Sequence, residues 1–181
     1  MKRIILIVLT AGIISLCGCS PEKAPEPAQQ IPVFTLAPAD KEKLMAFRKD
    51  LLSIESLTDT AVKLAGAELK NVITGGKVSI NLPSVIDKAK AECMLAGEAL
   101  AKKGVPEALS PEAKKLLNDG KTGLVSAYTA YADSFEAIKS FVSDKNPMAL
   151  LEYRKKSAEA QKLYNEAADK IKSIMTAAGV A

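Results

Sequence analysis

Apolar side chains recur three and four residues apart over most of this 181-residue chain, and this spacing constrains the fold more than any other feature. Because an α-helix has 3.6 residues per turn, side chains at these spacings share one face that can be buried. The pattern begins after Asp40, a residue type that caps helix N-termini, and runs through Leu44, Leu51 and Leu69 to about Thr74. Aromatic residues make up only 4% of the chain, and both Trp and His are absent, a composition that favours helices over sheets. The sequence therefore predicts an all-α fold.

A second helix is predicted to start near Pro83 or Ser84, because Ser84 and Asp87 have the spacing of a capping box. It should end at Lys103, before a glycine and a proline that stop a helix. Its apolar face carries Ile86, Ala89, Cys93, Ala96 and Leu100.

The third helix is predicted to begin with Ser110 as N-cap and Pro111 in its first turn, and the fourth begins in the same way with Asn146 and Pro147. Gly179 ends the fourth helix. The apolar face of the third helix consists of Leu117, Gly120, Leu124, Ala127, Tyr131, Ser134, Ile138 and Phe141. That of the fourth consists of Leu150, Tyr153, Ser157, Ala160, Tyr164, Ala167, Ile171, Ile174 and Ala178.

Helix lengths indicate how the four helices pack. At 1.5 Å per residue, the first, third and fourth helices are about 50 Å long and the second only about 30 Å. Residues 77–82, if extended, add about 20 Å and make up the difference. We therefore predict an up-down-up-down four-helix bundle over residues 40–181, with an extended strap before the second helix. A β-hairpin around Gly75-Gly76 is the alternative for residues 71–82, disfavoured because an isolated two-stranded hairpin is marginally stable.

The first eighteen residues have the features of a cleaved signal peptide. Lys2 and Arg3 precede an apolar run from Ile4 to Leu16, which is too short to span a bilayer comfortably. The run ends in Leu16-Cys17-Gly18-Cys19, which resembles the lipobox of bacterial lipoproteins, with an apolar residue three positions before the modified cysteine and a small one directly before it. An ordinary cleaved signal, with both cysteines incidental, is the alternative.

The resemblance implies that signal peptidase recognises Leu16, Cys17 and Gly18 and cuts before Cys19, whose thiol carries a diacylglyceryl group and whose new amine takes a further acyl chain. Palmitate-type chains on Cys19 would then anchor the protein to the lipid bilayer of the cell envelope. In a diderm host, Ser20 in place of Asp resembles the pattern of lipoproteins sorted to the outer membrane, facing the periplasm.

Residues 19–39 are predicted to form a tether. Residues 20–39 contain five prolines, so this stretch cannot be helical. At about 3.1 Å per residue, such a segment holds the body up to roughly 60 Å from the bilayer. Val33, Phe34 and Leu36 interrupt its polarity, and they either dock on the body or bind a partner.

The residue inventory excludes several kinds of chemistry. Without histidine, a Ser-His-Asp or Cys-His arrangement and the Glu-x-x-His di-iron motif of helical bundles are impossible. No cysteine spacing for zinc or haem is present, so no metal, cofactor or catalytic residue is predicted. Cleavage before Cys19 removes two basic residues and leaves 23 against 21 acidic ones, a balance that does not suggest nucleic acid.

A cluster of tyrosines is the remaining candidate site. Folding the third helix back on the fourth brings Tyr164 level with Tyr128 and Tyr131, where the rings either line a small-molecule pocket or fill the core. Cys93 is expected to be a buried small hydrophobic residue.

The expected function is that of a membrane-anchored bacterial lipoprotein that is not an enzyme and that binds or assists another protein of the cell envelope. The main alternative is a helical bundle that binds a small molecule near Tyr128, Tyr131 and Tyr164. A third hypothesis is an enzyme whose catalytic groups are carboxylates alone.

Overall fold

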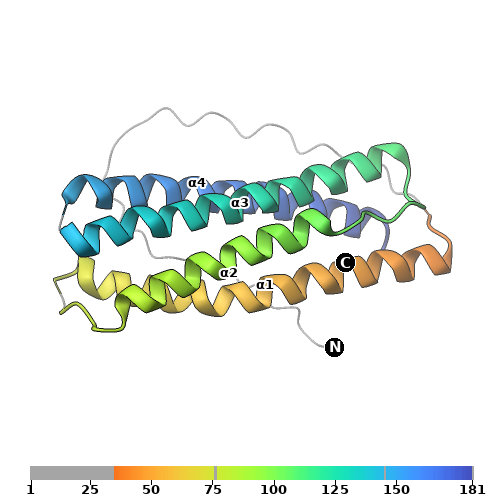
Figure 1. Cartoon of the computed structure of the whole chain (residues 1–181). Helices are drawn as coiled ribbons and strands as arrows, with labels where there is room; N and C mark the ends of the chain where they lie inside the picture. The colour runs from red at the N-terminus through yellow and green to blue at the C-terminus, as the bar shows by residue number, and fades with distance from the viewer. Residues whose placement is uncertain (1–34, 76, 145, 181) are drawn as a thin grey trace, which may run out of the picture.

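The computed structural model describes residues 35–75, 77–144 and 146–180 of the chain. These residues form four helices and no strand: α1 (Pro38–Ile73), α2 (Leu82–Lys102), α3 (Pro111–Asp144) and α4 (Pro147–Ala177). Figure 1 shows the helices side by side along one long axis, with the chain reversing direction at each connection. The predicted all-α, up-down-up-down four-helix bundle is confirmed.

The four helices share one hydrophobic core. α3 packs most extensively against α4, α2 against α3, and α1 against α2. The predicted apolar faces point into this core, where the side chains of Leu44, Ile86, Leu124, Ile138 and Ile174 are fully buried. Phe141 and Tyr153 are only half-buried. α3 buries more than its predicted face, because Tyr128, Ala132, Phe135 and Ala137 are also buried there.

Glycines bring α3 and α4 close together. A Cβ atom added at Gly120 would lie 2.8 Å from Cγ1 of Ile171, and one at Gly123 would lie 2.9 Å from Cβ of Ala167. Carbon atoms pack at about 3.5–4.0 Å, so neither position has room for a side chain. At Gly97 the nearest atom, the carbonyl oxygen of Val125, would be 3.9 Å away, which is an ordinary contact. Gly120 and Gly123 therefore serve close helix packing and leave no space for a ligand.

Two of the four predicted helix starts are confirmed. The side-chain oxygen of Ser110 accepts a hydrogen bond from the backbone N–H of Ala113 (3.2 Å), and that of Asn146 accepts one from the backbone N–H of Met148 (3.0 Å). These bonds satisfy N–H groups that have no partner within the helix. At the other end of α4, Gly179 has a φ of +65° and closes the helix as predicted.

The predicted N-cap at Asp40 is wrong. α1 starts at Pro38, whose fixed φ suits the first helical position, and the carbonyl oxygen of Ala37 accepts hydrogen bonds from the N–H groups of both Asp40 and Lys41. Asp40 lies in the first turn, where its charge faces the positive end of the helix dipole, and pairs with Lys43. The helical body thus begins two residues before residue 40.

The predicted start of the second helix near Pro83 or Ser84 is also wrong by one to two residues. α2 begins at Leu82, whose side chain is fully buried, and the carbonyl oxygen of Asn81 accepts a hydrogen bond from the N–H of Val85. Burial of Leu82 outweighs the weak capping signal at Ser84. The extended strap is correspondingly shorter than residues 77–82, because residues 80 and 81 already form a turn.

The connection between α1 and α2 is a helix end and not a β-hairpin. α1 continues to Ile73, and Gly75 has a φ of +88°, the left-handed conformation that closes a helix. No strand is present among the described residues on either side of position 76.

The N-terminal predictions lie mostly outside the described residues. This holds for the signal peptide, the lipobox residues Leu16, Cys17, Gly18 and Cys19, and the tether up to Phe34. Leu36 lies within the described residues, is 8% exposed and packs into the core. For Leu36, this agrees with the interpretation that apolar residues of the tether dock on the helical body. Within the part of the chain that the structure describes, no helix is long and apolar enough to cross a membrane.

Candidate functional site

The structure brings the three predicted tyrosines together in the middle of the bundle. The rings of Tyr128 on α3 and Tyr164 on α4 meet edge to face, with centroids 6.5 Å apart and planes at 77°. Tyr131 lies one turn further along α3, and its hydroxyl donates a hydrogen bond to Oε1 of Gln161 on α4 (3.0 Å). Tyr128 and Tyr131 are buried, and Tyr164 is half-buried. The predicted cluster therefore forms from two adjacent helices.

A carboxylate from α1 completes this cluster. The hydroxyl of Tyr164 on α4 donates a hydrogen bond to Oε1 of Glu55 on α1 (3.1 Å). We call Glu55, Tyr128, Tyr131, Gln161 and Tyr164 the tyrosine cluster. Glu55 was not predicted, because a glutamate on a long charged helix is normally solvated and no local signal shows that it faces a distant helix.

Burial shifts the pKa values within the tyrosine cluster. Burial raises the pKa of Glu55; the hydrogen bond from Tyr164 opposes this shift, and the nearby charge of Asp59 adds to it. Burial also raises the pKa of Tyr131 to about 12. The pKa values of Tyr128 and Tyr164 are raised further, mainly by burial and then by the charge of Glu55. The tyrosines therefore stay protonated near neutral pH, as hydrogen-bond donors rather than bases.

The tyrosine cluster is packed as part of the core. Tyr128, Tyr131 and Tyr164 line neither the groove between α1 and the α2–α3 connection nor the groove between α3 and α4. The rings of Tyr128 and Tyr164 contact each other, and the hydroxyls of Tyr131 and Tyr164 are already bonded to Gln161 and Glu55. This geometry favours the interpretation of the tyrosines as core rings with polar groups at the rim.

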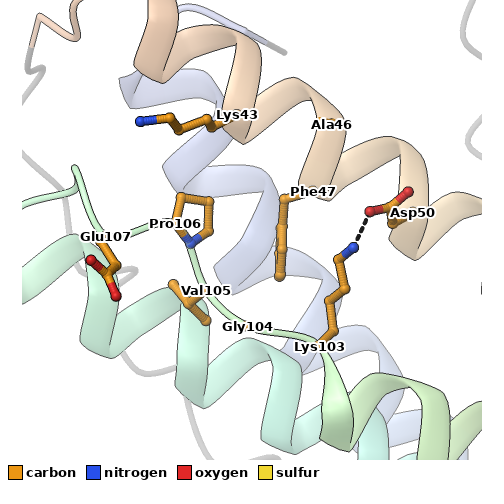
Figure 2. Close-up of a pocket in the computed structure, with 9 residues that line it drawn as sticks. All are labelled: Lys43, Ala46, Phe47, Asp50, Lys103, Gly104, Val105, Pro106 and Glu107. Atoms are coloured by element: carbon orange, nitrogen blue, oxygen red, sulfur yellow. Dashed lines mark hydrogen bonds and ion pairs between the residues drawn. The ribbon is translucent and has the colours of Figure 1, made fainter.

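A groove of about 460 Å³ lies where the first turns of α1 pass the connection between α2 and α3. In Figure 2 the ring of Phe47 and the ring of Pro106 face the space, and Lys103 reaches across to Asp50. Nζ of Lys121 also donates a hydrogen bond to the carbonyl oxygen of Lys103 (2.9 Å), which fixes this connection. The lining residues are Lys43, Ala46, Phe47, Asp50, Lys103, Gly104, Val105, Pro106 and Glu107. The groove thus has apolar walls, and a rim whose Lys103 and Asp50 neutralise each other.

A second groove, of about 360 Å³, lies between α3 and α4. Its charged side chains are Asp133 on α3 and Lys156 and Glu159 on α4, and Lys156 forms an ion pair with Glu152 (2.9 Å). Among the residues that the structure describes, no group of three or more Cys, His, Asp or Glu side chains is placed to hold a metal ion.

Cys93 is fully buried on α2. Burial raises the pKa of its thiol to about 12, and the neighbouring charge of Glu92 contributes to the shift. Since the thiolate is the reactive form, the Cys93 side chain behaves as the small core residue that the sequence predicts.

No protein-family model, no curated protein and no solved structure matches this chain.

Proposed function

We propose that this chain is a bacterial lipoprotein whose helical body is held at a membrane by acyl chains on Cys19. The observation that carries the proposal is the order of features at the N-terminus. A basic start and an apolar run lead into Leu16-Cys17-Gly18-Cys19, and a proline-rich segment follows before the first helix. Two or three acyl chains bind a bilayer far more tightly than the single chain that gives only reversible attachment. In a diderm host the protein faces the periplasm from the outer membrane.

The proposed role of the body is to bind or assist another protein of the envelope, without catalysis. The chain has no histidine for acid–base work near neutral pH, and its one described cysteine is buried. The tyrosine cluster is packed, whereas large apolar side chains are exposed on α1, α2 and α4. A tight core with exposed apolar side chains favours a protein partner over an enclosed small molecule.

Metabolic labelling with a palmitate analogue tests the anchor. The wild-type chain should incorporate label and move to the membrane fraction, while Cys19→Ser should remain an unlabelled precursor. Cys17→Ser is the matched control, because that residue leaves with the signal peptide and its loss should not prevent labelling. Normal processing of Cys19→Ser would refute the lipoprotein assignment.

Crosslinking in intact cells, followed by mass spectrometry, tests the role of the body. A specific envelope protein should be recovered with the wild-type chain, and its recovery should fall when Cys19→Ser removes the anchor. Recovery of no specific neighbour would argue against an interaction role.

Binding of a small molecule near Tyr128, Tyr131 and Tyr164 remains the alternative proposal. It is supported less well, because a ligand there would have to displace the hydrogen bonds of Tyr131 and Tyr164.

A further inference from the structure

α1 buries few side chains for its length. It is the longest helix, with 36 residues, and seven of them are buried, whereas α3 buries twelve of its 34 residues. Between Leu51 and Leu69 the buried side chains are small, and the larger Ile54 and Val62 are only half-buried. The small ones are Thr58, Ala61 and Ala65. Because burial of apolar area is the main force that holds a helix in a bundle, this stretch of α1 is held weakly.

The contacts that connect α1 with α4 are polar. Arg48 donates a hydrogen bond to the carbonyl oxygen of Val180, three residues after α4 (3.3 Å), and Tyr164 on α4 donates one to Glu55. Arg48 and Glu55 are seven residues apart, close to two helical turns, so both lie on the same side of α1. We call these two hydrogen bonds the α1–α4 bridges.

The backbone of α1 packs extensively against that of α2 alone, and the backbones of α1 and α4 do not approach as those of packed helices do. Long side chains therefore connect α1 to α4 across a distance that close helix packing does not fill. Such hydrogen bonds contribute less than the interlocking apolar side chains that join α3 to α4. The α4 side of α1 is thus the weakest helix contact of the bundle.

Glu55 makes one of the α1–α4 bridges sensitive to pH. Its side chain is half-buried, and it forms no ion pair within residues 35–75, 77–144 and 146–180. The titratable groups that interact with it are Asp59 on α1, Tyr128 on α3 and Tyr164 on α4. Lys103, which reaches α1 from α2, pairs with Asp50. Without a cation beside it, the ionised form of Glu55 is disfavoured by burial, which raises its pKa.

We propose that α1 opens from the bundle as a unit while α2, α3 and α4 stay packed, and that ionisation of Glu55 favours this opening. Opening places the ionised carboxylate in water, whereas the closed bundle favours the neutral carboxyl. The closed form is therefore held most firmly below the ordinary carboxyl pKa, and α1 opens more readily as pH rises through the folded-state pKa of Glu55. Opening uncovers the apolar side chains of Leu44, Phe47 and Leu51, which the closed bundle buries.

Hydrogen exchange of the full chain in a mild detergent, read by mass spectrometry, measures the opening of each helix. Where a helix recloses faster than its amides exchange, the exchange rate divided by that of an unstructured chain gives the opening constant. At pH 7 we expect the opening constant of residues 52–68 in α1 to exceed those of α2, α3 and α4 by at least about tenfold. Between about pH 4 and pH 7, the α1 constant should rise at least about twofold relative to that of α3.

Three conservative substitutions test the part played by Glu55. Glu55→Gln keeps an oxygen that accepts the hydrogen bond of Tyr164 but cannot ionise, so it should lower the opening of α1 at pH 7 and remove the rise with pH. Tyr164→Phe removes one α1–α4 bridge and should raise the opening of α1 at pH 7 about fivefold or more. Glu136→Gln is the matched control, because it makes the same change in the ion pair with Lys90 that joins α3 to α2 (2.6 Å). It should leave the opening of α1 unchanged.

Several outcomes would overturn the inference. A single opening constant shared by all four helices would show that α1 unfolds only with the whole bundle, and joint opening of α1 and α2 would place the weakest contact between α2 and α3. An opening of α1 that is independent of pH, or equal effects of Glu55→Gln and Glu136→Gln, would exclude Glu55 as the controlling group. None of these readouts depends on palmitate labelling or cellular crosslinking, so the proposed function can fail or stand independently.

Discussion

Substitution of three helical glycines by alanine separates helix propensity from the closeness of α3 and α4. Alanine is more favourable than glycine in a helix interior by about 0.8–1.0 kcal/mol. At Gly66 on α1, an added Cβ has no atom within 4 Å, so Gly66→Ala should stabilise the protein by about that amount. At Gly123 the added Cβ lies 2.9 Å from Cβ of Ala167, and α4 must move by about 0.6 Å to restore a normal contact.

Overpacking of this kind costs about 1–3 kcal/mol, which exceeds the gain in helix propensity. Gly123→Ala should therefore be destabilising by up to about 2 kcal/mol. Gly120→Ala should behave in the same way, because its Cβ would meet Cγ1 of Ile171 at 2.8 Å and the carbonyl oxygen of Ala167 at 3.2 Å. Equilibrium urea unfolding, followed by circular dichroism at 222 nm as the standard helix signal, measures all three free energies.

A double-mutant cycle makes the argument specific to one contact. Ala167→Gly alone should destabilise the protein, since it removes a buried methyl group and lowers helix propensity. Combined with Gly123→Ala it moves the methyl group from α4 to α3, so the double variant should be more stable than the sum of the single effects by about 1 kcal/mol or more. Strictly additive effects, or a stabilising Gly123→Ala, would show that the two helices are not in the close contact described.

Three further predictions concern single side chains. The raised pKa of Glu55 means that burial favours its neutral form in the folded state. The contribution of Glu55 to the free energy of unfolding is therefore fully present below the ordinary carboxyl pKa, and it is lost as pH rises through the folded-state pKa. Glu55→Gln should therefore be more stable than wild type near pH 7, with the difference shrinking towards about pH 4; a difference that grows on acidification would contradict the burial argument. The Cys93 thiol should react with a thiol reagent slowly in buffer and fast in urea, whereas rapid labelling of the folded protein would reopen a redox role. Asn146→Ala should cost about 1 kcal/mol of stability because it removes the helix cap, while Ser84→Ala should change little; equal costs in urea unfolding would show that the assigned helix starts are incorrect.

The tyrosine cluster shows how far sequence reasoning reaches toward a site. Helix periodicity and the reversal between α3 and α4 were enough to predict that Tyr128, Tyr131 and Tyr164 meet. Periodicity cannot show which polar residue of another helix joins the three tyrosines, so Glu55 on α1 was missed. Whether the rings enclose a cavity also depends on side-chain packing, which has no local sequence signal.

The sequence by itself determined the helices, their order and their main apolar faces, because 3.6-residue periodicity and the stop signals at glycine and proline act locally. It also contains Leu16-Cys17-Gly18-Cys19, on which the proposed lipidation of Cys19 rests; a motif of four consecutive residues does not depend on the fold of the body. Tertiary structure decided where α2 begins, because burial of Leu82 outweighs a capping preference of about 1 kcal/mol at Ser84. It also decided that Gly120 and Gly123 serve close packing, and that the leucines of α1 outside its buried face remain exposed. These outcomes depend on which helices become neighbours, a long-range property that each segment does not specify alone.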